Sequence, residues 1–360
     1  MQDGIQTRCI VIEDPHEPTT ADLDNIKMAG QVIKDGGLCA FPTETVYGLG
    51  GDALNPASSG KIYAAKGRPS DNPLIVHIAD IKDIEKIAED IPDAAYILAE
   101  KFWPGPLTMI LKGNGTVPTA TTGGLSTVAV RYPSDKVAAA LIRAAGGFVA
   151  APSANTSGRP STTTAAHVLE DLSGRVDVII DGGDVDIGLE STIVDLTEST
   201  PAILRPGYIT LDMIKTVLPD AYYDPAIIDP DSGEAPKAPG MKYRHYAPKG
   251  KLTIVKGEKE AVACYIAGLA LQKRQEGAGV GLMVSAENRE CFDESVFSVV
   301  KTVGEERDDG TIAHNLFAVL REFDEAGVEY IFSESFDGGR LSDAITNRLL
   351  KAAGYDVIEV

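Results

Sequence analysis

Apolar residues recur along the chain with two alternating periods. After Thr20, the segment ADLDNIKMAGQVIKDGG carries apolar residues at helical spacing and ends at paired glycines, and the short apolar run LCAF follows it. Helical spacing that stops at glycine and gives way to a short apolar run predicts a helix and then a strand. The same alternation continues to about residue 207, so the pattern predicts an α/β domain.

Further runs of both kinds fill this first domain, which is predicted to span residues 10–207. The strand-like runs are PLIVHIA, LTMILK, TVAVR, FVAA, VDVII and STIVDL, and the helical ones are DAAYILAEKFW, VAAALIRAA and TAAHVLEDL. Because these elements do not follow a strict strand-helix-strand repeat, we expect a mixed, twisted sheet with helices packed against it.

The pattern changes twice beyond residue 207. Residues 208–250 are dense in Pro, Asp and Gly, which is the composition of a linker. In residues 251–360, short apolar runs alternate with helical segments near 258–273, 310–325 and 341–352. This alternation predicts a smaller parallel α/β domain, Rossmann-like in outline. Its turns lack GxGxxG and any Walker pattern, so we expect a supporting or regulatory domain.

Length and charge limit the kinds of partner. With 360 residues and 44% hydrophobic content, the chain can build a core in each of two domains. The formal net charge is -20, and acidic residues occur in both halves. General affinity for a nucleic-acid backbone needs clustered Lys and Arg, so the charge excludes a basic nucleic-acid-binding module. Any RNA contact is expected to be weak and confined to a narrow patch.

Cysteine usage predicts a reduced protein. The four cysteines show no CxxC or metal-like spacing, so we expect free and mostly buried thiols at Cys9, Cys39, Cys264 and Cys291. The N-terminal residues lack the charge order of a signal peptide, and no apolar run approaches the roughly 20 residues that span a membrane. The interpretation is a cytoplasmic protein without a membrane partner, and no metal-ligating residues are predicted.

Cations mark one candidate segment. KGRPSDNPL at 66–74 places Lys66 and Arg68 two positions apart, on the same side of the chain if the segment is extended. Flanking prolines would hold these two side chains in place. Such a pair suits a phosphate group, which Arg binds as a fork and Lys as a point charge. A solvated basic turn is the alternative.

Arg131 and His77 can each be interpreted in two ways. In GLSTVAVRYP, Thr127 and Arg131 are evenly spaced and share one face of a strand among apolar residues. A guanidinium that faces a core is costly unless paired, so Arg131 either meets an internal carboxylate or awaits an anionic ligand. His77 shares the face of Ile75 in LIVHI, and a lone strand histidine is usually packed rather than catalytic.

Small polar side chains accompany these cations at other strand ends. APSANTSGRPS supplies Ser153, Asn155 and Ser161, GLESTIVD supplies Ser191, and ILRPG ends the first domain with Arg205. No HExxH or recognisable nucleophile motif occurs. The set therefore favours binding and neutralising a phosphate over covalent catalysis.

The order of these motifs resembles the long, two-domain branch of the YrdC family, the L-threonylcarbamoyladenylate synthases. The motifs are FPTETVYGLG, KGRP with NPLIVHI, PSANTSGRPS, ESTIVD, LRPG and PGMKYRHYAP, and SDAITNRLLKAAG resembles the end of that branch's extra domain. The resemblance implies that L-threonine, bicarbonate and ATP with Mg²⁺ give threonylcarbamoyl-AMP and pyrophosphate. It also implies a downstream threonylcarbamoyl transferase complex, which modifies adenosine 37 of tRNA.

The resemblance assigns roles to individual residues. It implies catalytic roles for the KxR and SxN residues Lys66, Arg68, Ser153 and Asn155. It implies an L-threonine site at Thr45, His77, Arg131 and Ser191. It implies nucleotide contacts from Arg68, Asn72, Thr127, Ala151, Ser161, Arg205, Tyr243, His245 and Tyr246.

The last three of these residues lie in the linker segment MKYRHYAP. The resemblance implies that this segment folds over the cleft as an ordered lid and excludes water from a labile product. A plain tether is the alternative. Two other functions stay open on the same scaffold: a non-catalytic RNA-binding or ribosome maturation factor, and carbamoyl transfer in metallocentre maturation. The second would require acylphosphatase-like and Cys₄ zinc segments, which the sequence lacks.

Overall fold

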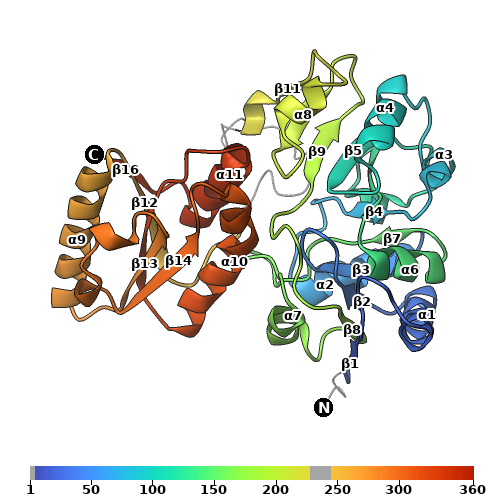
Figure 1. Ribbon diagram of the computed structural model, residues 1–360. Coiled ribbons are helices and arrows are strands. Elements are labelled where there is room, and N and C mark those ends of the chain that lie inside the picture. The colour runs from blue at the N-terminus through green and yellow to red at the C-terminus, as the bar shows by residue number, and fades with distance from the viewer. Residues whose placement is uncertain (1–4, 228–244) are drawn as a thin grey trace. The chain divides into compact units, whose positions relative to one another are not determined.

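The computed structural model describes residues 5–227 and 245–360, which form two compact units. The first unit contains the described residues 5–157, 161–186 and 190–227. The second contains residues 245–360 together with two short segments, 158–160 and 187–189. Both units are α/β (Figure 1).

The first unit is built on a sheet of eleven described strands in the order β1-β8-β2-β3-β7-β4-β6-β5-β9-β10-β11. The strands are β1 (Arg8–Val11), β2 (Cys39–Phe41), β3 (Gly48–Asp52), β4 (Ile75–His77), β5 (Leu107–Lys112), β6 (Thr127–Arg131), β7 (Val149–Ala150), β8 (Val178–Asp181), β9 (Thr192–Asp195), β10 (Ala202–Arg205) and β11 (Tyr222–Tyr223). The sheet contains both parallel pairs, such as β4 with β6, and antiparallel pairs, such as β5 with β6. The predicted mixed sheet is therefore confirmed.

Helices cover this sheet. They are α1 (Thr20–Lys34), α2 (Pro56–Lys66), α3 (Ile84–Ile87), α4 (Asp93–Phe102), α5 (Thr119–Thr122), α6 (Lys136–Ala144), α7 (Ala165–Leu172) and α8 (Leu211–Lys215), with short 3₁₀ turns at Ile81–Asp83 and Pro225–Ile227. The start of α1 is set by a capping box, in which Thr19 and Asp22 satisfy each other's backbone N–H groups. Helices α1 and α6 lie side by side (Figure 1).

The second unit has a parallel five-stranded sheet in the order β14-β13-β15-β12-β16. Its strands are β12 (Lys251–Lys256), β13 (Val280–Ser285), β14 (Val299–Gly304), β15 (Tyr330–Glu334) and β16 (Val357–Glu359). Its helices are α9 (Lys259–Gln275), α10 (Asp309–Glu325) and α11 (Ser342–Ala353), with 3₁₀ turns at Arg289–Cys291 and Glu294–Val296. Helix α9 lies on one face of the sheet, and α10 and α11 lie on the other (Figure 1). The predicted Rossmann-like parallel sheet is confirmed.

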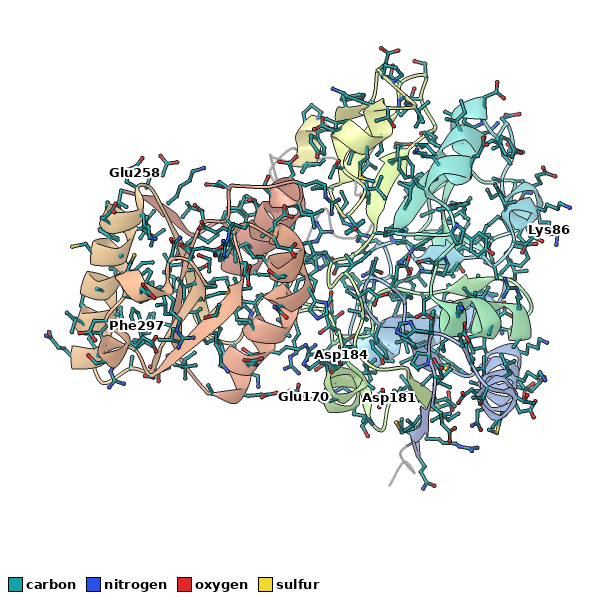
Figure 2. All side chains as sticks on the ribbon, in the orientation of Figure 1. Lys86, Glu170, Asp181, Asp184, Glu258 and Phe297 are labelled. Atoms are coloured by element: carbon teal, nitrogen blue, oxygen red, sulfur yellow. The ribbon has the colours of Figure 1, made fainter. Side chains whose placement is uncertain are left out.

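Charged side chains such as Lys86, Glu170, Asp184 and Glu258 lie at the surface, whereas Phe297 is buried in the second unit (Figure 2). In the part of the chain that the structure describes, no helix combines the length and the apolar character needed to cross a membrane.

The structure adds one strand that no apolar run predicted, and it differs from the sequence-based predictions at the start of the linker and in the burial of the thiols. The glycine-rich residues Gly48–Asp52 form strand β3, because β2 and β7 pair with it from both sides. Residues 208–227, which their composition assigns to the start of the linker, contain α8 and β11, and β11 pairs with β10. The prediction of mostly buried thiols is wrong, because only Cys39 is buried while Cys9, Cys264 and Cys291 are exposed; all four are free.

The close contact between α1 and α6 depends on Gly30. A Cβ atom at this position would lie 2.5 Å from the Cβ of Ala144. We expect Gly30→Ala to destabilise the protein by about 1–3 kcal/mol, because the two helices must move apart. Gly60→Ala in α2 is the matched control: nothing lies within 4 Å of its added Cβ, and a helical Gly→Ala change alone adds about 1 kcal/mol of stability. Urea unfolding measures both, and equal shifts in the midpoint would contradict this account.

Candidate active site

The register of the sheet brings three polar side chains into one row. His77 of β4 pairs with Arg131 of β6, and Arg131 pairs in turn with Thr108 of β5. Residues paired directly across neighbouring strands present their side chains on the same face. All three are buried, at 3%, 4% and 0% exposed respectively. The row is therefore a polar line inside the fold, built from segments far apart in the chain.

Lys66 is the last residue of α2 and is 2% exposed. The expectation that Lys66 and Arg68 lie on one extended segment is wrong: α2 continues through Lys66, and Gly67 then ends it in the left-handed conformation at φ 63°. The Lys66 ammonium donates to the carbonyl oxygens of Ser153, at 2.5 Å, and of Asn155. A buried ammonium requires such oxygen partners, so Lys66 ties the end of α2 to the 153–155 loop.

The 153–155 loop is itself held in place. Ser153 Oγ donates to Asn155 Oδ1 at 2.5 Å, and that oxygen lies 3.5 Å from Lys66 Nζ. The loop is joined to the opposite segment by the Ala154 N–H, which donates to Tyr47 O at 2.7 Å. The KxR and SxN side chains predicted from the sequence are thus neighbours in the structure at Lys66, Ser153 and Asn155.

Arg68 and Asn72 lie on the turn that follows α2. The Arg68 guanidinium donates to the carbonyl oxygens of Asn72, at 3.4 Å, and Pro73, at 3.1 Å. The Asn72 side chain is buried, and its Oδ1 atom has no hydrogen-bond partner among the described residues. A buried amide oxygen without a partner is costly, so Asn72 offers an acceptor to a ligand.

Ser191 is fixed by two neighbours. Its hydroxyl forms a 2.7 Å hydrogen bond with Thr108 Oγ1 and accepts from Arg205 Nη2 at 3.1 Å. Arg205 also donates from Nε to the Ser191 carbonyl at 3.0 Å. Glu190, which precedes Ser191 in the sequence, accepts a hydrogen bond at Oε1 from Ser161 Oγ at 2.5 Å. Ser191 and Arg205 therefore form one cluster with the row of His77, Arg131 and Thr108.

Arg131 meets an internal carboxylate. Its Nη2 atom lies 2.8 Å from Glu44 Oε2 in a buried ion pair, and Glu44 is 5% exposed. The charge of Glu44 also acts on Asp135, whose pKa is raised to about 7, chiefly by burial and also by that charge, although its hydrogen bond from Ala138 N–H acts in the opposite direction. Asp135 is therefore partly protonated near neutral pH. Of the two alternatives for Arg131, an internal carboxylate or an anionic ligand, the structure shows the internal carboxylate.

His77 is neutral at physiological pH. Its pKa is lowered to about 3, chiefly by burial and also by the charge of Arg131, although hydrogen bonds to backbone oppose both effects. Its Nδ1 atom lies 3.2 Å from Ile75 O, and its ring packs edge-on against Phe41. Both features agree with a packed histidine. A neutral imidazole can still contact a ligand through its second nitrogen.

The remaining predicted site residues lie at different places. Thr45 is buried and its hydroxyl bonds Thr43 Oγ1 at 2.9 Å. The Ala151 N–H donates to Ile75 O at 2.9 Å within the sheet. Thr127 shares β6 with Arg131 but begins the strand that Arg131 ends, so it lies about 13 Å away along the strand.

His245 and Tyr246 belong to the second unit. Tyr246 is 5% exposed and its ring packs 5.0 Å from that of Phe317. Tyr243 lies outside the described residues.

Sequence reasoning missed two residues of the cluster, Glu44 and Thr108. Glu44 lies in the quoted motif FPTETVYGLG, and an unpaired arginine on an apolar strand was a signal that a carboxylate had to lie nearby. Thr108 reads as part of an ordinary apolar strand, and only the pairing of β5 with β6 and β9 brings it to Arg131 and Ser191.

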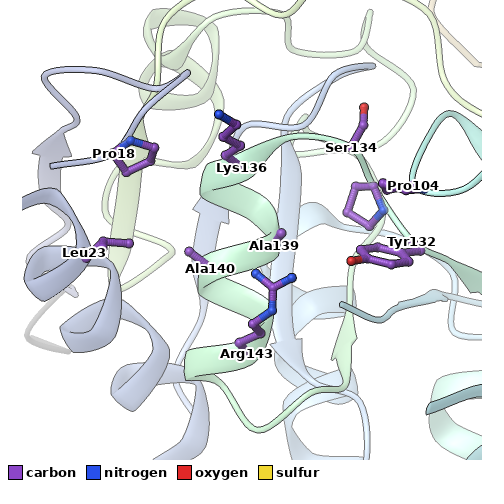
Figure 3. A pocket seen from close by; sticks show the side chains of 10 residues that line it. Pro18, Leu23, Pro104, Tyr132, Ser134, Lys136, Ala139, Ala140 and Arg143 are labelled. Atoms are coloured by element: carbon purple, nitrogen blue, oxygen red, sulfur yellow. The ribbon is translucent and has the colours of Figure 1, made fainter. Parts of the chain in front are cut away.

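A pocket of about 420 Å³ lies along α6 (Figure 3). Its lining includes Leu23, Tyr132, Lys136 and Arg143 and none of the predicted site residues. It presents two cations but no carboxylate. We place the chemistry at the strand ends instead, because opposite charges, hydroxyls and an amide converge there in buried positions.

The fold and the cluster define an α/β protein that gathers buried charged and polar groups at the ends of its strands. Residues 31–207 match the family model described as "Telomere recombination", and residues 209–354 match "Threonylcarbamoyl-AMP synthase, C-terminal domain". The chain belongs to the threonylcarbamoyl-AMP synthase family, and the resemblance drawn from its motifs is confirmed.

Relatives match over almost their full length. The threonylcarbamoyl-AMP synthase of Pyrococcus abyssi is 46% identical over 336 residues, which cover 93% of this chain and 96% of that protein. The one from Bacillus subtilis is 43% identical over 356 residues, covering 98% and 100%. A crystal structure of P. abyssi Sua5 complexed with L-threonine superimposes with a TM-score of 0.90 at 43% identity, covering 98% of this chain and 99% of that one. The chain is thus an enzyme of the transferase type.

The lowered pKa of His77 makes stability depend on pH. The unfolded chain binds a proton near pH 6.5 and the folded chain only near pH 3, so stability is lost as the pH falls below 6.5. At pH 5 the loss from this one group is about 2 kcal/mol. Urea unfolding of the wild type and of His77→Gln at pH 7 and pH 5 measures it. The variant should lose less stability between the two pH values, and equal losses would show that His77 takes up its proton freely when folded.

Proposed function

We propose that the chain catalyses the formation of threonylcarbamoyl-AMP and pyrophosphate from L-threonine, bicarbonate and ATP, for the threonylcarbamoyl modification of adenosine 37 of tRNA. The observation that carries the proposal is the convergence of Lys66, Ser153 and Asn155, together with the buried polar row of β4, β6 and β5. The names of the relatives and the L-threonine bound in the P. abyssi structure support the same reaction.

The cationic part of the site suits ATP. The Lys66 ammonium and the Arg68 guanidinium now bond backbone carbonyls, and both can turn toward phosphate oxygens, which are stronger acceptors. We assign to them, with Ser153 and Asn155, the stabilisation of the charge that develops at the α-phosphate and on the leaving pyrophosphate. Asn72, Thr127, Ala151, Ser161 and Arg205 are proposed nucleotide contacts.

Magnesium is proposed to enter with ATP. No group of three or more acidic, histidine or cysteine residues suited to a metal occurs within residues 5–227 and 245–360. The oxygens around the Lys66 ammonium are the backbone carbonyls of Ser153 and Asn155 and, at 3.5 Å, the neutral amide oxygen of Asn155. Such a donor set fits Mg²⁺, which takes many of its ligands from substrate phosphates and water. The ion would neutralise charge on those phosphates when bound.

The second cluster suits L-threonine. We propose that Arg131 binds the substrate carboxylate and that Thr45, His77 and Ser191 complete the L-threonine site. Arg131, His77 and Ser191 are brought within one buried cluster by strand register and by Thr108. Neutral His77 can offer a hydrogen bond to the threonine hydroxyl without adding charge beside Arg131.

Three further parts of the proposal concern the surroundings of the reaction. The linker that includes Tyr243, His245 and Tyr246 is proposed to close over the nucleotide and keep water from a labile mixed anhydride. The product is proposed to pass to a threonylcarbamoyl transferase complex that acts on tRNA, and the enzyme is proposed to work in the cytoplasm. The charge of -20 argues against an RNA-binding factor as the main function and limits any RNA contact to a narrow patch.

The reaction is tested by omitting each component in turn. We expect the purified full-length chain to release pyrophosphate and to form an adenylate of the mass of threonylcarbamoyl-AMP only when ATP, Mg²⁺, L-threonine and bicarbonate are all present. Coupled phosphate detection and mass spectrometry measure the two products. No release from a folded protein under any combination would reject the synthase and favour the RNA-binding alternative, which salt-dependent tRNA titration then examines.

The phosphate assignment is tested at Arg68. Because each transition-state donor contributes about 100- to 1,000-fold in kcat, Arg68→Ala should lower kcat by that order and leave the unfolding midpoint almost unchanged. Lys101→Ala, at an exposed position on α4, is the matched loss of one cation and should leave kcat unchanged. Wild-type turnover in Arg68→Ala would remove this residue from the catalytic set.

A further inference from the structure

The buried ion pair between Glu44 and Arg131 is incompletely satisfied. Both side chains are more than nine-tenths buried, and Arg131 Nη2 lies 2.8 Å from Glu44 Oε2. Apart from this charge contact, the two oxygens of Glu44 have no hydrogen-bond partner within the described residues. The same is true of the Nε and Nη2 atoms of Arg131. A surplus acceptor and a surplus donor thus remain side by side.

Such an arrangement is costly without a ligand. Removing two charges from water is repaid only when good hydrogen bonds satisfy the rest of their atoms. Here the bare atoms are the Oε1 atom of a carboxylate and the Nε atom of a guanidinium. Neighbouring groups do not supply what is missing, because His77 is neutral and Asp135 adds only acidic character.

The pair is complementary to a ligand that carries both charges. A simple anion bound at Arg131 would lie next to the Glu44 carboxylate and be repelled by it. A zwitterion can place its anionic end on Arg131 and its cationic end on Glu44, so that every charge meets an opposite one. In an α-amino acid a single carbon separates ammonium from carboxylate, so the two charges are about as close together as those of the ion pair itself.

We propose that Glu44 is a substrate-binding residue that accepts hydrogen bonds from the ammonium group of an α-amino acid whose carboxylate is bound by Arg131. The inference rests on the proposed function in taking L-threonine as that amino acid. Glu44 then selects for the amino group that the reaction consumes, and it rejects hydroxy acids that Arg131 alone would accept. Glu44 makes Arg131 a zwitterion site rather than a general anion site.

The experiment compares two ligands that differ in one group. L-Threonine and its deamino analogue 3-hydroxybutyrate are titrated calorimetrically into the full-length wild type, Glu44→Gln and Glu334→Gln, without ATP or bicarbonate. Glu334 is a buried glutamate of the second unit, so its variant controls for the loss of a buried carboxylate elsewhere. Urea unfolding confirms that each variant is folded.

The expected result is a change in selectivity. The wild type should bind L-threonine at least tenfold more tightly than 3-hydroxybutyrate. Glu44→Gln should lose at least tenfold in affinity for L-threonine and keep or gain affinity for 3-hydroxybutyrate, whereas Glu334→Gln should match the wild type for both. Equal losses for both ligands in Glu44→Gln would show that Glu44 merely positions Arg131, and this overturns the proposal.

A second measurement does not depend on the variant's folding. If the wild type binds 3-hydroxybutyrate as tightly as L-threonine, ammonium recognition is rejected without any mutation. The outcome is also separable from that of the proposed reaction. If threonine binding depends on Glu44 but no pyrophosphate is released, the synthase is rejected and the amino-acid site is kept. If pyrophosphate is released but threonine binding does not depend on Glu44, only the role of Glu44 is rejected.

Discussion

The buried ammonium of Lys66 is the interaction on which the arrangement of the site depends. Because Lys66 is buried, its ammonium has little contact with water and takes its oxygen partners from the backbone of Ser153 and Asn155. A helix end and a loop 87 residues further along the chain are thereby joined. The Ser157 N–H returns a hydrogen bond to the Lys66 carbonyl at 2.9 Å, so both ends of one residue hold the same loop. The groups that we propose to bind phosphate are pre-positioned by this link.

The mixed sheet performs the same task for the second cluster. Because β4 and β6 run parallel while β5 runs antiparallel to β6, the end of two strands meets the start of a third. His77, Arg131 and Thr108 fall on one row for that reason, and Ser191 joins them through Thr108. A regular strand-helix-strand fold would place functional groups at a single edge. The mixed sheet instead buries them within the layer.

The charge around the site differs in sign from the net charge of the chain, because several cations are buried there. The chain is strongly acidic, yet Lys66, Arg131 and Arg205 are all buried. Charges in such surroundings interact more strongly than charges in water and are screened less by salt. An acidic chain can therefore present a cationic site to a nucleotide and a paired site to an amino acid, while its surface remains negative.

Several features were determined by the sequence itself. Hydrophobic periodicity depends only on local residues, so it predicted the mixed α/β first unit and the parallel second one, and the order of the motifs identified the family. The tertiary structure decided the rest. Strand β3 forms from glycine-rich residues because β2 and β7 pair with it, and Lys66 ends a helix because α2 continues to Gly67. The ion pair of Glu44 with Arg131 joins residues far apart in the chain. Such contacts depend on which strands become neighbours, and a local pattern of residues carries no record of that choice.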